Sequence, residues 1–179
     1  MKLLIVILST FFTVAASAAN YTDLAFEAGF RNQNADVTNS DTSAQTAYQL
    51  GLSAAFPMVN SWSFRTGLFY TQKNFQVKAT PNQNYKFTYV EIPATAMYKF
   101  MDYAGVYGGL NVSMNMDSDC NNNTCHKVES LVTPIVIGAA FKFAPQFGAD
   151  VYFETYSGKI EQNTKNIKAI GANLMVTFD

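Results

Sequence analysis

Residues 87–100 read FTYVEIPATAMYKF and combine the features of a β-strand with two residues that a uniformly apolar strand would not contain. Tyr, Phe, Val, Ile and Thr dominate the stretch, as is typical of strands. Glu91 nevertheless lies at its centre, and Pro93, which has no amide hydrogen to donate, follows two positions later. A strand with one face toward lipid and the other toward a polar interior would accommodate the carboxylate, and the rest of the chain repeats this pattern.

The beginning of the chain has the features of an export signal. Lys2 precedes an apolar run that ends near the small residues Ala-Ser-Ala at 16–18, which form a signal cleavage site. The alternative, an uncleaved membrane helix, is disfavoured because the run is shorter than the roughly 20 residues that a bilayer requires. We therefore predict a cleaved signal peptide over residues 1–18 and a single mature domain over residues 19–179.

Charge excludes one class of partner. The formal net charge is -1 and charged residues make up 14% of the chain, so no basic surface is expected that could bind nucleic acid.

Beyond residue 20 there is no apolar run of 18 residues, so the mature chain is not expected to contain a transmembrane helix.

Period-2 alternation of apolar and polar residues recurs in eight segments, which are residues 24–30, 47–56, 62–70, 85–100, 103–114, 131–143, 147–156 and 167–178. The connections alternate between short ones, at 57–60, 101–102 and 144–146, and long polar ones, at 32–46, 71–84, 115–127 and 157–166. Such asymmetry is the signature of outer-membrane barrels. The sequence predicts an all-β fold: an eight-stranded antiparallel up-and-down transmembrane β-barrel with short periplasmic turns and long extracellular loops.

The charged residues of these strands fall almost entirely on one face. An eight-stranded barrel is only just wide enough inside for side chains, so the many Phe and Leu of the other face must point outward, to lipid. Lys168 has the outward parity, and at the end of its strand it can reach the lipid headgroups. The charged face forms a predicted ionic network in the lumen, comprising Glu27, Arg31, Arg65, Glu91, Lys99, Lys142, Asp150 and Glu154.

Four acids and four bases in this network balance, as buried charges must. Arg65 is expected to be the hub and to pair with Glu91, because a guanidinium can serve more than one carboxylate. Pro93 and Pro134 have the inward parity and are expected to mark a bulge or a local irregularity. Aromatic residues cluster at the short-turn ends and predict an interfacial girdle, namely Phe56, Trp62, Tyr98, Phe100, Phe141, Phe143, Phe147 and Phe178.

These features together resemble a known family. The signal-like start, the eight alternating strands, the YVEIP of residues 89–93 and the near-terminal VTF are similar to the small eight-stranded outer-membrane barrels of the OmpA and OmpX type. The resemblance covers essentially the whole mature chain and implies residence in the bacterial outer membrane. It also implies that Phe178 is read by the barrel-assembly machinery, although Asp179 rather than an aromatic residue ends the chain.

Few residues carry reactive chemistry. His126 is the single histidine, and a catalytic role with Asp117 or Asp119 is the weakest of the readings considered. No cluster indicates a metal site or a cofactor. Cys120 and Cys125 enclose four residues, and in an exported protein such a pair favours a disulfide over half of a metal site.

The leading functional hypothesis is a non-enzymatic outer-membrane protein. Its barrel would be plugged by side chains and would have a structural or surface-interaction role at the cell envelope. The alternative is a narrow porin-like passive channel for small solutes. The expected partners are outer-membrane lipid, the assembly machinery and an unknown extracellular ligand bound by the loops, and the barrel is expected to be a monomer.

The cysteine pair generates a first prediction. Cys120 and Cys125 should form an intramolecular disulfide that the barrel does not require, because it would close only a short external loop. Alkylation of the unreduced, denatured protein should find no free thiol, and Cys120→Ser should still assemble. Two alkylated cysteines would contradict the disulfide, and failure of Cys120→Ser to assemble would contradict its peripheral role.

Overall fold

The computed structural model describes residues 23–37, 40–78, 82–120, 128–161 and 164–178. The predicted signal peptide, residues 1–18, lies outside this part of the chain. The described residues form nine strands, which are β1 (Asp23–Val37), β2 (Thr42–Pro57), β3 (Trp62–Val77), β4 (Gln83–Met101), β5 (Ala104–Asp119), β6 (Leu131–Val132), β7 (Ile135–Ala144), β8 (Phe147–Glu161) and β9 (Thr164–Phe178). Among the residues described, no helix is long and apolar enough to cross a membrane.

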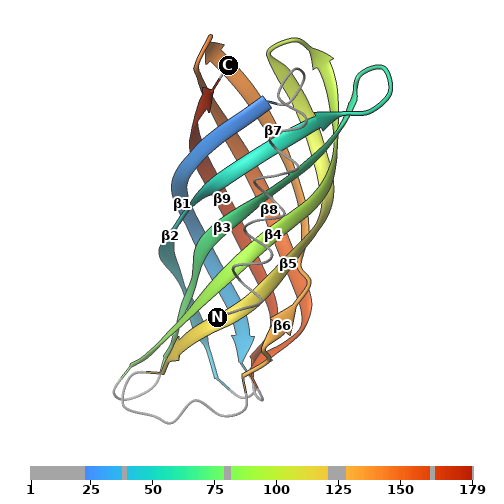
Figure 1. Cartoon of the computed structure of the whole chain (residues 1–179). Coiled ribbons are helices and arrows are strands. Elements are labelled where there is room, and N and C mark those ends of the chain that lie inside the picture. Colours follow the sequence, from blue (N-terminus) through green and yellow to red (C-terminus); the bar gives the residue numbers. More distant parts are fainter. Residues whose placement is uncertain (1–22, 38–39, 79–81, 121–127, 162–163, 179) are drawn as a thin grey trace.

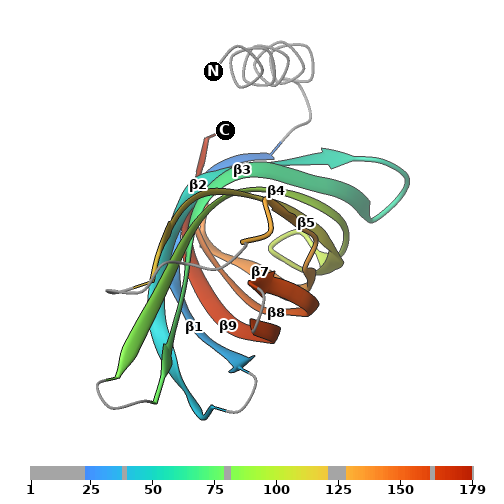
Figure 2. The same ribbon diagram turned by 90° about the horizontal axis from the view of Figure 1, so that it is seen from below.

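The strands close into one antiparallel ring. Neighbours follow the order β4-β3-β2-β1-β9-β8-β7-β5, and pairing between β4 and β5 completes the circle. Figure 1 shows the tilted strands from the side, and Figure 2 shows the ring of strands from below. The predicted barrel is therefore confirmed, with β6 and β7 together forming its sixth wall segment. We call the end with the connections β2–β3, β4–β5 and β7–β8 the turn end, and the opposite end the hairpin end.

The two inward-facing prolines interrupt strand pairing without shifting its register. Pro134 lies in the break between β6 and β7, and Asn111 of β5 donates its amide hydrogen to the Pro134 carbonyl at 2.9 Å. Next to Pro93, the β3–β4 ladder is interrupted between the pairs Thr66–Ala94 and Phe69–Glu91. The predicted irregularities are thus interruptions rather than bulges, because a missing donor breaks one bond and inserts no residue.

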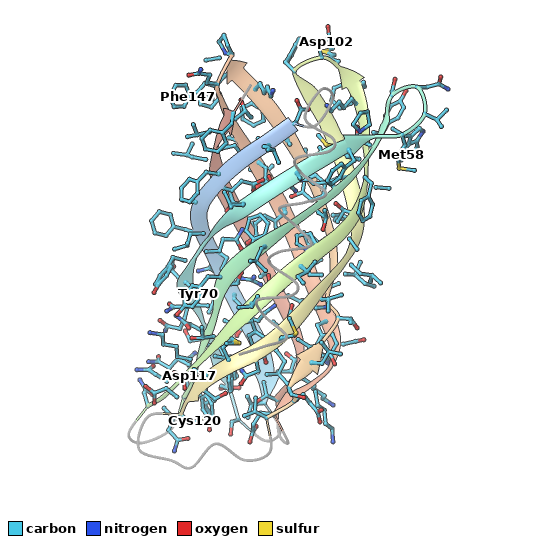
Figure 3. The ribbon with its side chains drawn as sticks, in the orientation of Figure 1. Met58, Tyr70, Asp102, Asp117, Cys120 and Phe147 are labelled. Atoms are coloured by element: carbon cyan, nitrogen blue, oxygen red, sulfur yellow. The ribbon has the colours of Figure 1, made fainter. Side chains whose placement is uncertain are left out.

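The outer surface over most of the barrel is apolar. Leu52, Ile137 and Leu174 are among the large apolar side chains that are more than half exposed. Near the turn end, which Met58, Asp102 and Phe147 mark in Figure 3, the exposed aromatic residues include Trp62, whose ring lies 5.2 Å from that of Tyr98. A surface of this kind is stable against lipid and not against water.

The strands continue far beyond their predicted bounds at the hairpin end. β3 runs to Val77 and β4 begins at Gln83, so most of the predicted loop 71–84 is a paired hairpin. Similar extensions occupy most of the predicted loops 32–46 and 157–166, and part of 115–127. The long extracellular connections are therefore mainly strands, and the loop bounds predicted from polarity were wrong.

Polarity inverts within these extensions. In β3 the outward residues change from Leu68 and Tyr70 to Asn74 and Gln76, while the inward residue Phe75 is completely buried. Such alternation is that of a strand with its outer face in water. The inward residues from all sides form a buried apolar cluster that we call the cap, consisting of Ala35, Phe75, Val77, Phe87, Tyr89, Cys120, Val132, Ile160 and Ile167.

Candidate functional site

The lumen is the candidate site because it holds the charged side chains of the barrel. Seven Asp, Glu, Lys and Arg residues are buried there: Glu27, Arg31, Arg65, Lys73, Glu91, Asp150 and Glu154. Six of them were predicted from strand parity, and Lys73 was not. They divide into two layers along the barrel, which lie between an apolar ring near the turn end and the cap at the hairpin end.

The layer nearer the turn end, which we call the lower layer, contains Glu27, Arg65 and Asp150. The Arg65 Nη2 atom lies 2.6 Å from the Glu27 Oε1 atom and 2.9 Å from the Asp150 Oδ2 atom. Asn173 donates to both carboxylates, at 3.3 Å to Glu27 and 3.0 Å to Asp150. Ser53 donates to Glu27 as well. One guanidinium from β3 therefore joins a carboxylate of β1 and a carboxylate of β8, the strand opposite β3 in the ring.

Tyr107 completes the lower layer and depends on a glycine. Tyr107 donates its hydroxyl hydrogen to the Asp150 Oδ2 atom at 2.8 Å, and the Arg65 guanidinium lies 4.4 Å from the centre of the Tyr107 ring. A Cβ atom at Gly138 would overlap this ring. Strand glycines often mark such close approach, and Gly138 here makes room for a hydrogen-bond donor. The alternation of apolar and polar residues along the sequence does not reveal that Gly138 lies against the Tyr107 ring.

The layer nearer the hairpin end, which we call the upper layer, contains Arg31, Lys73, Glu91 and Glu154. The Lys73 Nζ atom lies 2.7 Å from oxygen atoms of both Glu91 and Glu154. The Arg31 Nη2 atom lies 2.6 Å from the Glu154 Oε1 atom. The Arg31 Nη1 atom is 4.0 Å from Glu91, which is a weaker contact.

Neutral donors satisfy the remaining carboxylate oxygens of the upper layer. Asn111 donates to the Glu154 Oε2 atom at 2.9 Å, and Thr71 donates to the Glu91 Oε2 atom at 3.2 Å. Ser113 donates at 2.7 Å to the Glu91 Oε1 atom, which Lys73 also contacts. Buried ion pairs repay their desolvation only when the remaining lone pairs are bonded too. Glu91, the carboxylate that looks misplaced in its strand, is thus held by Lys73 and by hydroxyl donors.

Lys99 and Lys142 do not join either layer. Both lie at the turn end and are partly exposed. The Lys99 Nζ atom lies 2.5 Å from the Asp23 Oδ2 atom, and the Lys142 Nζ atom lies 3.8 Å from the Asp23 Oδ1 atom. The predicted balance of four acids against four bases in one lumen network therefore does not hold, because Lys99 and Lys142 lie at the mouth of the barrel. The lower layer carries one excess negative charge and the upper layer is neutral. At the mouth, the two lysines line the turn-end cavity together with Asp23 and Asp102.

The structure also corrects the predicted partner of Arg65. Sequence parity suggested Glu91, but that carboxylate belongs to the upper layer, and the ion pairs of Arg65 are with Glu27 and Asp150. Parity identifies which side chains enter the lumen and not their heights in neighbouring tilted strands. The register Phe69–Glu91 places Glu91 four residues further along β3 than Arg65.

The space left in the lumen is small and divided. A cavity of about 70 Å³ at the turn end is lined by Asp23, Lys99 and Lys142, and it ends at Glu27 and Arg65. A second cavity of about 30 Å³ lies between the layers and is lined by Glu27, Glu91 and Asp150, among others. The second cavity is large enough for about one water molecule.

Of the reactive residues singled out from sequence, Asp117, Asp119 and Cys120 lie at the hairpin end. Cys120 is buried in the cap at the end of β5, where Figure 3 shows it beyond Asp117. Cys125 and His126 lie outside the described residues, so their disulfide and catalytic hypotheses remain predictions. Within the described part of the chain, no group of His, Cys, Asp and Glu side chains could hold a metal ion.

Double-mutant cycles should separate the two layers. Arg65→Leu leaves two buried carboxylates without their cation, and loss of one member of such a pair costs about 3–5 kcal/mol. Glu27→Gln in the same chain should recover part of this loss, with a coupling free energy of about 0.5–3 kcal/mol. The free energy of unfolding can be measured in detergent and denaturant, with the folded fraction read from heat-modifiable gel migration.

Glu91→Gln supplies the matched control for this cycle. It removes a carboxylate of the same lumen that belongs to the other layer, so its effect should be nearly additive with that of Arg65→Leu. Strong coupling of Arg65 to Glu91 together with additivity toward Glu27 would contradict the layer assignment.

Solved structures share this architecture. Neisserial surface protein A superposes with a TM-score of 0.59 at 18% identity, covering 87% of this chain and 97% of its own. Ail, the attachment invasion locus protein of Yersinia pestis, gives 0.56 at 13% identity, with coverages of 88% and 99%. Ail in complex with the heparin analogue sucrose octasulfate gives 0.52 at 13% identity, with the same coverages. At these identities the likeness shows the fold.

Comparison of the sequence with known families identifies the family, which the structural likeness does not. No curated protein matches the chain significantly. Residues 12–158, however, match the family model of the outer membrane protein beta-barrel domain, which covers most of the chain. With the closed ring and its lipid-facing surface, this match establishes that the chain belongs to the outer membrane protein β-barrel domain family of the bacterial outer membrane.

Proposed function

We propose that this protein is a closed, non-enzymatic barrel that presents the hairpin end at the cell surface, with a structural or surface-interaction role at the envelope. The observation that carries the proposal is the filling of the lumen. Two ionic layers occupy its middle, and the cap fills its hairpin end with completely buried side chains such as Phe75 and Phe87. A solute would have to displace both.

The cap supports the surface role as well as the closure. The Phe75 ring lies 5.1 Å from that of Tyr85 and 5.9 Å from that of Phe87, within a paired hairpin. The outer face of the same hairpin carries polar groups, including a hydrogen bond of 2.7 Å from Gln76 to Asn84. A fixed polar surface loses little conformational entropy on binding. An extracellular ligand held by this surface is the partner that we propose.

The remaining elements of the proposal concern export and assembly. We propose that residues 1–18 are removed on export, that Phe178 is recognised by the barrel-assembly machinery, and that the barrel is a monomer surrounded by lipid. Phe178 is exposed at the turn end, where it pairs in register with Leu24. That position leaves its ring accessible from the membrane side.

A narrow passive channel is the second candidate, and one observation favours it. Both lumen cavities are lined by Glu27 and Arg65, so this single ion pair and its neighbours separate them. Movement of Arg65 would join the cavities. The cap would still close the hairpin end, which is why we place the channel second.

Electrical recording distinguishes the two candidates. The purified, folded protein in planar bilayers should give no steady conductance above that of bilayers treated with detergent alone, because the two ionic layers and the cap leave no continuous water path. Stepwise, steady conductance from heat-modifiable protein would refute the closed barrel and favour the channel.

A further inference from the structure

Three lysines lie close together on the outer face of the barrel wall at the hairpin end. Lys159 on β8 and Lys165 and Lys168 on β9 are exposed, and we call them the lysine patch. Lys159 pairs in register with Lys165, and Lys168 pairs with Thr155. Their neighbours Ile160 and Ile167 are buried in the cap, which fixes the lysines on the outer face. None of the three forms an ion pair with any residue that the structure describes.

A local distortion brings Lys165 and Lys168 onto the same face. Strict alternation would place residues three apart on opposite faces. The register of β9 against β1 shifts between Asn34 and Asp36, opposite these lysines, and Asn166 has a φ of 52°. Asn tolerates this left-handed conformation better than most residues. Bulges of this kind re-aim side chains, and this one adds a cation to the outer surface.

The patch is unlike the opposite side of the hairpin end. There, Lys86 of β4 pairs in register with Asp119, and the amide of Lys78 donates to the carbonyl of Asp41. An acidic residue thus lies opposite each of these two lysines along the backbone. In the lysine patch, Asp36 pairs in register with Lys165 and also accepts a hydrogen bond of 2.9 Å from Asn166. Lys159 and Lys168 have no acid as a register partner. Two of the three patch lysines therefore lack the acidic register partner that Lys86 has.

The patch begins where the apolar surface ends. Ile170, which follows Lys168 by two residues toward the turn end, is 68% exposed and faces outward with Leu174. From Lys168 the patch continues for three residues to Lys165, about 10 Å of strand at roughly 3.3 Å per residue. The ammonium groups therefore lie at the depth of the lipid headgroups, where long cationic side chains are stable.

We propose that the lysine patch binds the phosphate groups of outer-leaflet lipid. Like charges directly opposite on neighbouring strands repel each other, as Lys159 and Lys165 do, and a phosphate between them would offset the repulsion. Lysine binds phosphate as a point charge. The proposal goes beyond surface display, because it concerns the membrane around the barrel and does not depend on whether the lumen is closed.

The test compares two lipids that differ only in phosphate. The folded protein in detergent is titrated with lipid A and with dephosphorylated lipid A, and bound lipid is counted by native mass spectrometry. Each lysine near an anionic surface contributes about a fivefold change in affinity. The wild type should retain the phosphorylated lipid at concentrations at least about fivefold lower than the dephosphorylated one. The variant Lys159→Gln/Lys165→Gln/Lys168→Gln should lose this preference.

Lys78→Gln/Lys86→Gln is the matched control, because it removes two exposed lysines at the same end but outside the patch. It should keep the preference, and Lys168→Gln alone should lose about fivefold. Heat-modifiable migration verifies that each variant is folded. An unchanged preference in the triple variant would overturn the proposal, as would an equal loss in the control. Complete displacement of the lipid by millimolar inorganic phosphate would show a site for a free anion instead.

Discussion

The interior of an eight-stranded ring is only as wide as the side chains that fill it. Any charge placed there must find its partner within the ring, because the wall excludes lipid headgroups and most water. Arg65 satisfies this constraint by joining Glu27 and Asp150, and Lys73 does so by joining Glu91 and Glu154. Both cations lie on β3 and reach carboxylates on β8, the opposite strand of the ring, so the ionic layers brace the barrel across its diameter and leave no continuous path along it.

The same constraint explains why the cap is apolar. Beyond the membrane the outer face of each strand meets water, so its apolar residues move to the inside while the alternation continues. In β3 the change occurs between Lys73, the last inward charge, and Phe75, the first inward residue of the cap. The barrel is thus two folded units in one ring: a membrane section with a polar interior, and an external section with an ordinary hydrophobic core.

Much of this arrangement could be predicted from residue parity. Alternation identified the eight wall segments and the inward positions of Glu27, Arg31, Arg65, Glu91, Asp150 and Glu154. It did not reveal the register between tilted strands, so Glu91 was assigned to Arg65 instead of Lys73. Lys73 was missed because residues 71–84 were predicted to be a loop. The outward residues of this segment are polar, and polar outward residues are not expected in a strand that faces lipid. The bulge at Asn166 was likewise hidden, since it breaks the period on which the reading depends.

The central claim is that the hairpin end is a folded extension whose core seals the lumen. Hydrogen exchange of backbone amides in detergent tests it most directly, because ladder amides of a stable sheet exchange slowly even when water reaches the outer face. Residues 72–77 of β3 pair with residues 83–88 of β4. Their amides should be protected to a degree similar to those of residues 64–70 within the membrane section. Exchange of residues 72–77 as fast as that of the turn at 58–61 would contradict the claim.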